Sequence, residues 1–140
     1  VGKTGSGQVA KLANQAIVGI TIGAVSEALI LSKAAGANPR AVREAIKDGF
    51  AGSPILENHG KRILENNFKP GGKCSTQLKD MENIIQTARD SNVYLPISDK
   101  VKKLYALMVK QGKSNLDHSA LYLLLKRFKK YWPHDRLVFK

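Results

Sequence analysis

The stretch QVAKLANQAIVGITIGAVSEALILSKAA, residues 8–35, predicts one long helix that is apolar on nearly every side. Its first clear stop signal is Gly36. Because so much apolar surface needs burial, we expect this helix to be buried against its neighbours and, in an assembly, against a second subunit. Small residues along it, Gly19, Gly23 and Ala24, would let another helix approach closely.

The rest of the chain carries the start and stop signals of further helices. Asn38-Pro39 and Ser53-Pro54 each supply an N-cap followed by proline at the first helical position. The expected helices are AVREAIKD, stopped by Gly49; ILENHGKRILEN, interrupted by Gly60; TQLKDMENIIQTARD, capped by Ser75 or Thr76; ISDKVKKLYALMVKQ, opened by Pro96 and ended by Gly112; and HSALYLLLKRFKKYW, capped by Asp117. No run alternates as a strand does. The sequence therefore predicts an all-α fold of six helices.

Length and composition favour one globular domain. The chain has 140 residues, 43% of them hydrophobic, which is enough for a sizeable core. No run reaches the roughly 18 uninterrupted apolar residues of a membrane span, and no signal peptide is visible. The single cysteine, Cys74, fits a reducing compartment, and we expect the cytoplasm. With no assignable histidine partner, Cys74 is interpreted as a spectator thiol rather than a nucleophile.

The glycines of the opening segment VGKTGSGQVA fit two nucleotide motifs poorly. Gly2, Lys3 and Thr4 match the end of a phosphate-binding loop, which would need a preceding strand. The pattern G-x-G-x-x-A at residues 5–10 needs a strand and an acidic residue about 20 positions on, to hold a ribose. Glu27 has roughly that offset but lies in the same helix, some 30 Å along its axis. What remains is a glycine turn that opens a helix, where backbone N–H groups attract anions.

Three polar residues follow that turn. Lys11 and Asn14 are three positions apart, and Lys11 and Gln15 are four apart, so all three can lie on one helix face. A charge and two amides above an anion-friendly turn indicate a ligand site. The alternative is a solvated lysine with polar neighbours by chance.

The pattern G-x-G-x-x-x-K-x-x-N, made by Gly5, Gly7, Lys11 and Asn14, resembles the catalytic segment of the β-hydroxyacid dehydrogenases. This is the family of 3-hydroxyisobutyrate dehydrogenase and tartronate semialdehyde reductase. The resemblance extends to about Leu125. Its other anchors are Lys79-Asp80 at the start of a later helix, a proline-initiated helix after it, and the segment of Asp117, Ser119 and Ala120.

The resemblance implies a domain organisation. Residues 1–125 would be the helical C-terminal domain of a 6-phosphogluconate-dehydrogenase-like fold, which binds substrate, mediates dimerisation and begins with a long interdomain helix. Residues 126–140 would be a basic tail. An N-terminal Rossmann domain, which binds NAD or NADP, would lie outside this chain, so we expect the chain alone to be inactive. The intact enzyme would be a homodimer or homotetramer joined through the helical domain.

The resemblance also implies roles for individual residues. Lys11 would be the general acid and base of hydride transfer between the nicotinamide cofactor and a small 3-hydroxy acid or its semialdehyde, of the 3-hydroxyisobutyrate or 2-hydroxy-3-oxopropionate type. Lys79 would face the cofactor. The substrate-binding residues would be Gly5, Gly7, Asn14, Gln15 and Asp80. Relatives often have an aromatic residue where this chain has Gly72, which implies a wider cleft, a different substrate or an impaired site.

Two readings from other classes stay open. The net charge of +12 and pI near 10.0, with Tyr131 and Trp132 beside basic residues, would suit a helical nucleic-acid-binding module. A stand-alone dimerisation module would explain the small residues of the first helix. The three histidines, His59, His118 and His134, have no spacing that indicates a metal site, so no metal is expected.

Overall fold

The computed structural model describes residues 5–130, which form helices and one isolated bridge between Lys73 and Asp117. The elements are α1 (Ser6–Ala34), α2 (Pro39–Ile46), α3 (Pro54–Leu64), α4 (Cys74–Asp90), α5 (Pro96–Lys110), the 3₁₀ segment η1 (His118–Ala120), α6 (Leu121–Leu125) and the 3₁₀ segment η2 (Lys126–Lys130). No strand occurs within this described range, so the predicted all-α class is confirmed.

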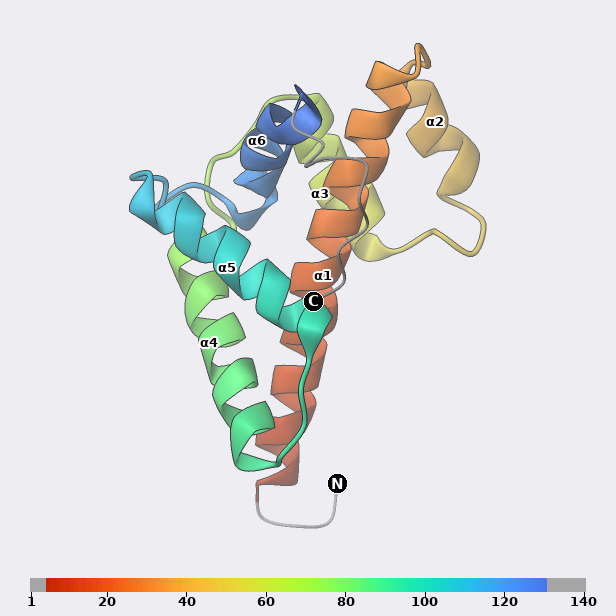
Figure 1. Ribbon diagram of the computed structural model, residues 1–140. Helices are drawn as coiled ribbons and strands as arrows, with labels where there is room; N and C mark the ends of the chain where they lie inside the picture. The colour runs from red at the N-terminus through yellow and green to blue at the C-terminus, as the bar shows by residue number, and fades with distance from the viewer. Residues whose placement is uncertain (1–4, 131–140) are drawn as a thin grey trace.

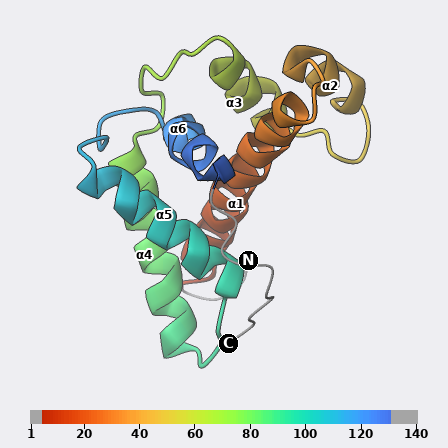
Figure 2. The same ribbon diagram turned by 45° about the horizontal axis from the view of Figure 1, so that its top comes forward.

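Helix α1 is the axis of the molecule. Figure 1 shows it running the length of the fold, with α4 and α5 beside its N-terminal half and α2 and α3 beside its C-terminal half. Figure 2 shows α6 packed against the middle of α1, between these two groups. Every other α-helix therefore contacts α1, which agrees with its predicted packing against neighbouring helices.

Two groups of buried side chains hold the helices to α1. The larger joins α1 to α4, α5 and α6 and includes Ile22, Met81, Tyr105 and Leu121, all fully buried. The smaller joins α1 to α3 and consists of Val25, Leu29, Leu56 and Ile63. Burial of each large aliphatic side chain contributes about 1.5–3 kcal/mol, so these contacts, rather than helix propensity, fix the arrangement.

Burial of α1 is less complete than its composition predicted. Val9, Ile17 and Leu31 are 56%, 66% and 68% exposed. The expected burial against neighbouring helices is therefore found on only part of α1, and burial against a second subunit stays a prediction. By length and composition α1 also qualifies as a candidate membrane span, although polar residues interrupt its apolar run. Its contacts with α3, α4, α5 and α6 are those of a core helix in a globular bundle.

The small residues of α1 serve contacts inside the chain. A Cβ on Gly19 would lie 2.9 Å from Nε2 of Gln77 and 3.0 Å from Sδ of Met81, both on α4. Gly23 is less constrained, since the nearest atom to its Cβ position, in Leu121, is 3.9 Å away. The close approach that the sequence indicated at Gly19 is thus made by α4 of the same chain.

Most of the predicted helix starts are confirmed, with one exception. The side chains of Asn38 and Ser53 accept hydrogen bonds from the first turns of α2 and α3, as expected. Capping of α4 by Ser75 or Thr76 is wrong, because α4 begins at Cys74 without a side-chain cap. Its first N–H groups donate instead to carbonyl groups of residues 114 and 116 in the loop after α5.

The last predicted helix is broken rather than continuous. Asp117 does cap its start by accepting from Ser119 N–H, but a 3₁₀ turn, the five-residue α6 and a second 3₁₀ segment follow. Within the helix of residues 54–64, Gly60 causes no interruption. It is buried, and its Cβ position lies 3.4 Å from the Arg43 side chain, so it leaves room for α2 to contact α3.

Candidate functional site

The glycine turn that opens α1 has the backbone that the sequence implied. Gly5 is the N-cap residue with φ of 91°, a left-handed conformation that favours glycine. Its carbonyl accepts a 3.0 Å hydrogen bond from Val9 N–H. A Cβ at Gly5 or Gly7 would meet nothing within 4 Å among the described residues. The turn is therefore open on the side where a ligand could approach.

Behind the turn, predicted site residues of α1 and α4 come together. Asn14 Nδ2 donates to Gln15 Oε1 at 3.0 Å, and Gln15 Nε2 donates to Asp80 Oδ2 at 2.8 Å. Lys11, Asn14 and Lys79 are exposed, whereas Gln15 and Asp80 are half-buried. We call these five residues the α1 face. Among the described residues, neither Lys11 nor Lys79 takes part in an ion pair or side-chain hydrogen bond, so both ammonium groups can bind a ligand.

Gln77, one turn before Asp80, extends the contacts into the interior. Its side chain is almost completely buried, at 2% exposure. Nε2 donates to the backbone carbonyl of Gln15 at 3.4 Å, which orients the amide and leaves Oε1 to face His118 Nδ1 at 3.0 Å. Because an amide oxygen only accepts, His118 Nδ1 carries the proton.

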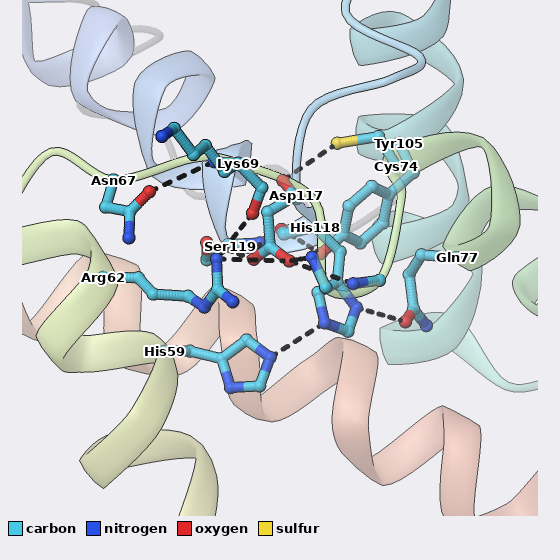
Figure 3. Close-up of polar contacts among 12 residues, drawn as sticks. His59, Arg62, Asn67, Lys69, Cys74, Gln77, Tyr105, Asp117, His118 and Ser119 are labelled. Carbon is cyan, nitrogen blue, oxygen red and sulfur yellow. Dashed lines mark hydrogen bonds and ion pairs between the residues drawn. The ribbon is translucent and has the colours of Figure 1, made fainter.

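His118 then meets His59 edge to edge. Their Nε2 atoms lie 2.8 Å apart (Figure 3). In the neutral pair, His118 Nε2 is the acceptor and His59 Nε2 the donor, which leaves His59 Nδ1 without a hydrogen bond among the described residues. Burial lowers the pKa of both histidines below the usual histidine value, although nearby Asp117 opposes the shift.

Asp117 anchors a second polar region. Oδ1 accepts from the N–H groups of Gly71 and Gly72 at 2.9 and 3.0 Å, and Oδ2 accepts from both N–H and Oγ of Ser119. Arg62 Nη1 lies 3.8 Å from Oδ1. Burial alone would raise the pKa of this carboxyl, but the hydrogen bonds from Ser119, Gly72 and Gly71 outweigh it and lower the pKa to about 2. We call Asp117 and its four hydrogen-bonded groups the Asp117 centre.

Neighbouring side chains lock the backbone of this centre. Tyr105 Oη donates to the His118 carbonyl at 2.8 Å, and Cys74 Sγ contacts the Asp117 carbonyl at 3.4 Å. Burial raises the pKa of the Cys74 thiol to about 12, so it stays protonated at neutral pH. The interpretation of Cys74 as an unreactive thiol is confirmed on this ground.

A pocket of about 520 Å³ opens beside the Asp117 centre. His59 and His118 line it together with Lys61, Arg62 and Gly72. A Cβ on Gly72 would lie 3.1 Å from Cε1 and Nε2 of His118. The imidazole of His118 thus fills the space beside position 72, where an aromatic side chain would collide with it.

The structure therefore groups the predicted site residues of α1 and α4 but adds others that the sequence did not reveal. Asp117 was predicted as a helix cap and Ser119 only as part of a resemblance, so the local capping bonds were foreseeable but the bonds from Gly71 and Gly72 were not. The contact of His59 with His118 joins residues 59 positions apart, and no spacing rule indicates it. Tyr131, Trp132 and His134 lie outside the described residues.

The chain is similar to sequences of known oxidoreductases over most of its length. Residues 5–125 match the family model described as NAD-binding of NADP-dependent 3-hydroxyisobutyrate dehydrogenase. The chain is 44% identical over 126 residues to 2-hydroxy-3-oxopropionate reductase of Escherichia coli, covering 90% of this chain and 43% of that enzyme. It is 34% identical over 127 residues to a probable mitochondrial 3-hydroxyisobutyrate dehydrogenase-like protein of Arabidopsis thaliana, covering 91% and 38%.

Solved structures show the same fold. A 3-hydroxyisobutyrate dehydrogenase from Salmonella typhimurium superposes with a TM-score of 0.81 at 22% identity, over 86% of this chain and 42% of that one. The chain thus spans less than half the length of these relatives. With 121 of its 140 residues inside the family match, it belongs to the family of the NAD-binding helical domain of NADP-dependent 3-hydroxyisobutyrate dehydrogenases.

Proposed function

We propose that this chain is the helical domain of an NAD(P)-dependent hydroxyacid dehydrogenase or reductase, and that it supplies the catalytic lysine. The observation that carries the proposal is the α1 face. Gly5 and Gly7 of the family's pattern form the open turn, and Lys11 and Asn14 follow on α1. Next to Asn14, Gln15 donates a hydrogen bond to Asp80 of the Lys79-Asp80 pair. Residues 1–125 form this domain in the proposal, residues 126–140 a basic tail, and a Rossmann domain completes the enzyme.

Lys11 acts as the general acid and base. Its ammonium group gives a proton to the carbonyl oxygen of a semialdehyde during reduction, and the neutral amine takes the hydroxyl proton during oxidation. The exposure of Lys11 supports this role, because its amine lies where a substrate could reach it.

Asn14, Gln15 and Asp80 orient the substrate. Asn14 is exposed and its amide oxygen makes no hydrogen bond among the described residues, so it can accept from a substrate hydroxyl. Gln15 donates a 2.8 Å hydrogen bond to Asp80, and this bond orients the Gln15 amide that accepts from Asn14. The free N–H groups of the first turn, next to Gly5 and Gly7, suit the carboxylate of a hydroxy acid.

The residues of the α1 face also fit a nicotinamide cofactor. When bound, the cofactor donates or accepts the hydride. Lys79 is exposed on the same turn of α4 as Asp80, so its charge can contact the anionic cofactor while Asp80 stays on the substrate side. The open space at Gly5 and Gly7 leaves room for a ligand against the backbone.

The same proposal implies that another domain or subunit of the enzyme buries the exposed apolar side chains of α1. The exposed side chains of Val9, Ile17 and Leu31 support contact with the Rossmann domain or a second subunit in a homodimer or homotetramer. The similarity to 2-hydroxy-3-oxopropionate reductase favours a small semialdehyde as substrate. A cytoplasmic location stays a prediction, since plant relatives are named mitochondrial.

The direct test uses the full-length protein in two assays. One follows oxidation of NAD(P)H with 2-hydroxy-3-oxopropionate, and the other follows reduction of NAD(P)+ with 3-hydroxyisobutyrate. We expect turnover with at least one of the pair, and none from the chain alone. No turnover with either substrate and either cofactor would contradict the proposal. A salt-dependent gel shift with duplex DNA, at near-physiological ionic strength, tests the nucleic-acid alternative on the same preparation.

A further inference from the structure

His59 and His118 bring the same ring nitrogen, Nε2, into direct contact. Their Nε2 atoms lie 2.8 Å apart, with ring centroids at 4.7 Å and ring planes tilted by 60°. The lone pair of a ring nitrogen lies in the ring plane and points away from the ring. Figure 3 shows the two rings facing each other across this short gap, His59 from α3 and His118 from the start of η1.

A metal ion can be bound by both nitrogens once the rings move slightly apart and turn, because in the hydrogen bond each nitrogen points directly at the other. With Zn–N bonds of about 2.0–2.1 Å and tetrahedral geometry, two ligating nitrogens lie about 3.3 Å apart. The gap of 2.8 Å would have to widen by roughly half an ångström. His59 is half-buried, lines the open pocket, and has His118 as its hydrogen-bonding partner among the described residues. Its side chain can therefore move by this amount.

His118 is held as metal-binding histidines are held. Its Nδ1–H donates to an amide oxygen, Oε1 of Gln77, which fixes the tautomer with Nε2 free to accept. Gln77 is itself buried and anchored to the Gln15 carbonyl. This outer contact orients one ligand in advance and reduces the entropy lost on binding an ion.

The surroundings supply room and a negative charge. A carboxylate oxygen of Asp117 lies within 4.8 Å of the histidine nitrogens. Its four hydrogen bonds already occupy both oxygens, so Asp117 contributes charge rather than a metal–oxygen bond. Water can complete the coordination from the pocket of about 520 Å³. Lys61 and Arg62 line the same pocket and oppose a cation, so the affinity should be lower than at a closed structural site.

We propose that His59 and His118 form a two-histidine binding site for a divalent transition metal ion, open to solvent through the pocket. Zn²⁺, Cu²⁺ and Ni²⁺ suit imidazole ligands, whereas Mg²⁺ prefers oxygen. On binding, the proton of His59 moves from Nε2 to Nδ1, so that both rings stay neutral and both Nε2 atoms ligate the ion. The ligands are not residues of the α1 face, although Gln77, which orients His118, is hydrogen-bonded to the carbonyl of Gln15.

The test is titration of the metal-free 140-residue chain with Zn²⁺, Cu²⁺, Ni²⁺ and Mg²⁺ by calorimetry. It is combined with electron paramagnetic resonance of the Cu²⁺ complex. We expect one Zn²⁺, Cu²⁺ or Ni²⁺ ion per chain, no Mg²⁺ binding, and two imidazole nitrogens coupled to copper. Absence of binding by all three transition metals, or coupling to fewer than two imidazoles, would overturn the proposal.

Three variants locate the site. His59→Gln and His118→Gln should each weaken binding at least about tenfold, and His134→Gln, which removes the third histidine, should leave it unchanged. Circular dichroism checks that each variant folds. If His118→Gln does not, His59→Gln decides, because its ring lies at the pocket and no other described residue hydrogen-bonds to it. Unchanged affinity in His59→Gln would refute the site.

Discussion

The α1 face and the Asp117 centre are both polar, and Gln77 links them, yet they differ in how their bonding capacity is used. At the Asp117 centre a carboxylate that is 1% exposed accepts four hydrogen bonds from within the chain. At the α1 face Lys11, Asn14 and Lys79 are exposed and largely without partners among the described residues. A satisfied, buried group stabilises the fold, whereas an exposed, unsatisfied group beside an open turn is available for a ligand.

The largest expected difference between the two regions is in catalysis, which should depend on the α1 face. Lys11→Ala in the full-length protein should lower kcat roughly 100- to 10,000-fold, because it removes the proposed general acid and base. The melting temperature should change little, since the side chain is exposed. Steady-state kinetics and thermal melts measure both quantities.

Two matched variants separate proton transfer from charge. Lys11→Arg keeps the charge but cannot release its proton near neutral pH, so it should be nearly as inactive as Lys11→Ala. Lys33→Ala removes an exposed lysine at the other end of α1 and should leave kcat unchanged. Recovery of most activity in Lys11→Arg would show that Lys11 supplies charge alone.

A substitution in the Asp117 centre should instead lower the stability of the fold. Asp117→Asn replaces an accepting oxygen by a donating amide opposite other N–H donors, which should cost about 3 kcal/mol of the free energy of unfolding. Urea denaturation of the 140-residue chain measures this loss. Asp99→Asn, which alters an ion-paired carboxylate near the start of α5, should have a much smaller effect. Similar losses in both variants would contradict the structural role of Asp117.

The stability contributed by Asp117 should also depend on pH. Its folded pKa of about 2 lies below the unfolded value near 3.9, so the contribution is complete above about pH 4 and is lost as the pH falls through 2. The shift corresponds to about 3 kcal/mol in full, of which about 2 kcal/mol is lost by pH 2. The difference in unfolding free energy between the unmodified chain and Asp117→Asn should shrink by this amount between pH 5 and roughly pH 2. A constant difference would mean that the pKa of Asp117 is not lowered.

The smallest expected effect concerns the contact that joins the two regions. Gly19→Ala places a Cβ 2.9 Å from Nε2 of Gln77, so the side chains of Gln77 and Met81 must shift, at a cost of roughly 1–3 kcal/mol. Gly23→Ala meets only an ordinary contact and gains up to about 1 kcal/mol of helix propensity. Denaturation curves should therefore move in opposite directions. Equal stabilisation by both variants would show that Gln77 does not need this space.

Much of this protein could be predicted from local sequence. Caps at Asn38 and Ser53, prolines at first helical positions and the long apolar run of α1 predicted the all-α fold, since these signals act within a few residues. The spacing of Lys11, Asn14 and Gln15 predicted one polar face, because the helical repeat alone brings residues three and four apart together.

Contacts between distant residues were decided only by the tertiary structure. The start of α4 is capped by backbone carbonyls of residues 114 and 116, which packing brings there. The pairing of His59 with His118 and the two bonds from Gly71 and Gly72 to Asp117 likewise depend on how α3 and the loop before α4 meet η1, whereas the two bonds from Ser119 are local. The sequence by itself determined the helices and the common side of Lys11, Asn14 and Gln15 on α1, whereas packing added Lys79 and Asp80 of α4. The packing of the helices determined the Asp117 centre, because sequence spacing carries no information about which remote polar groups will be buried together.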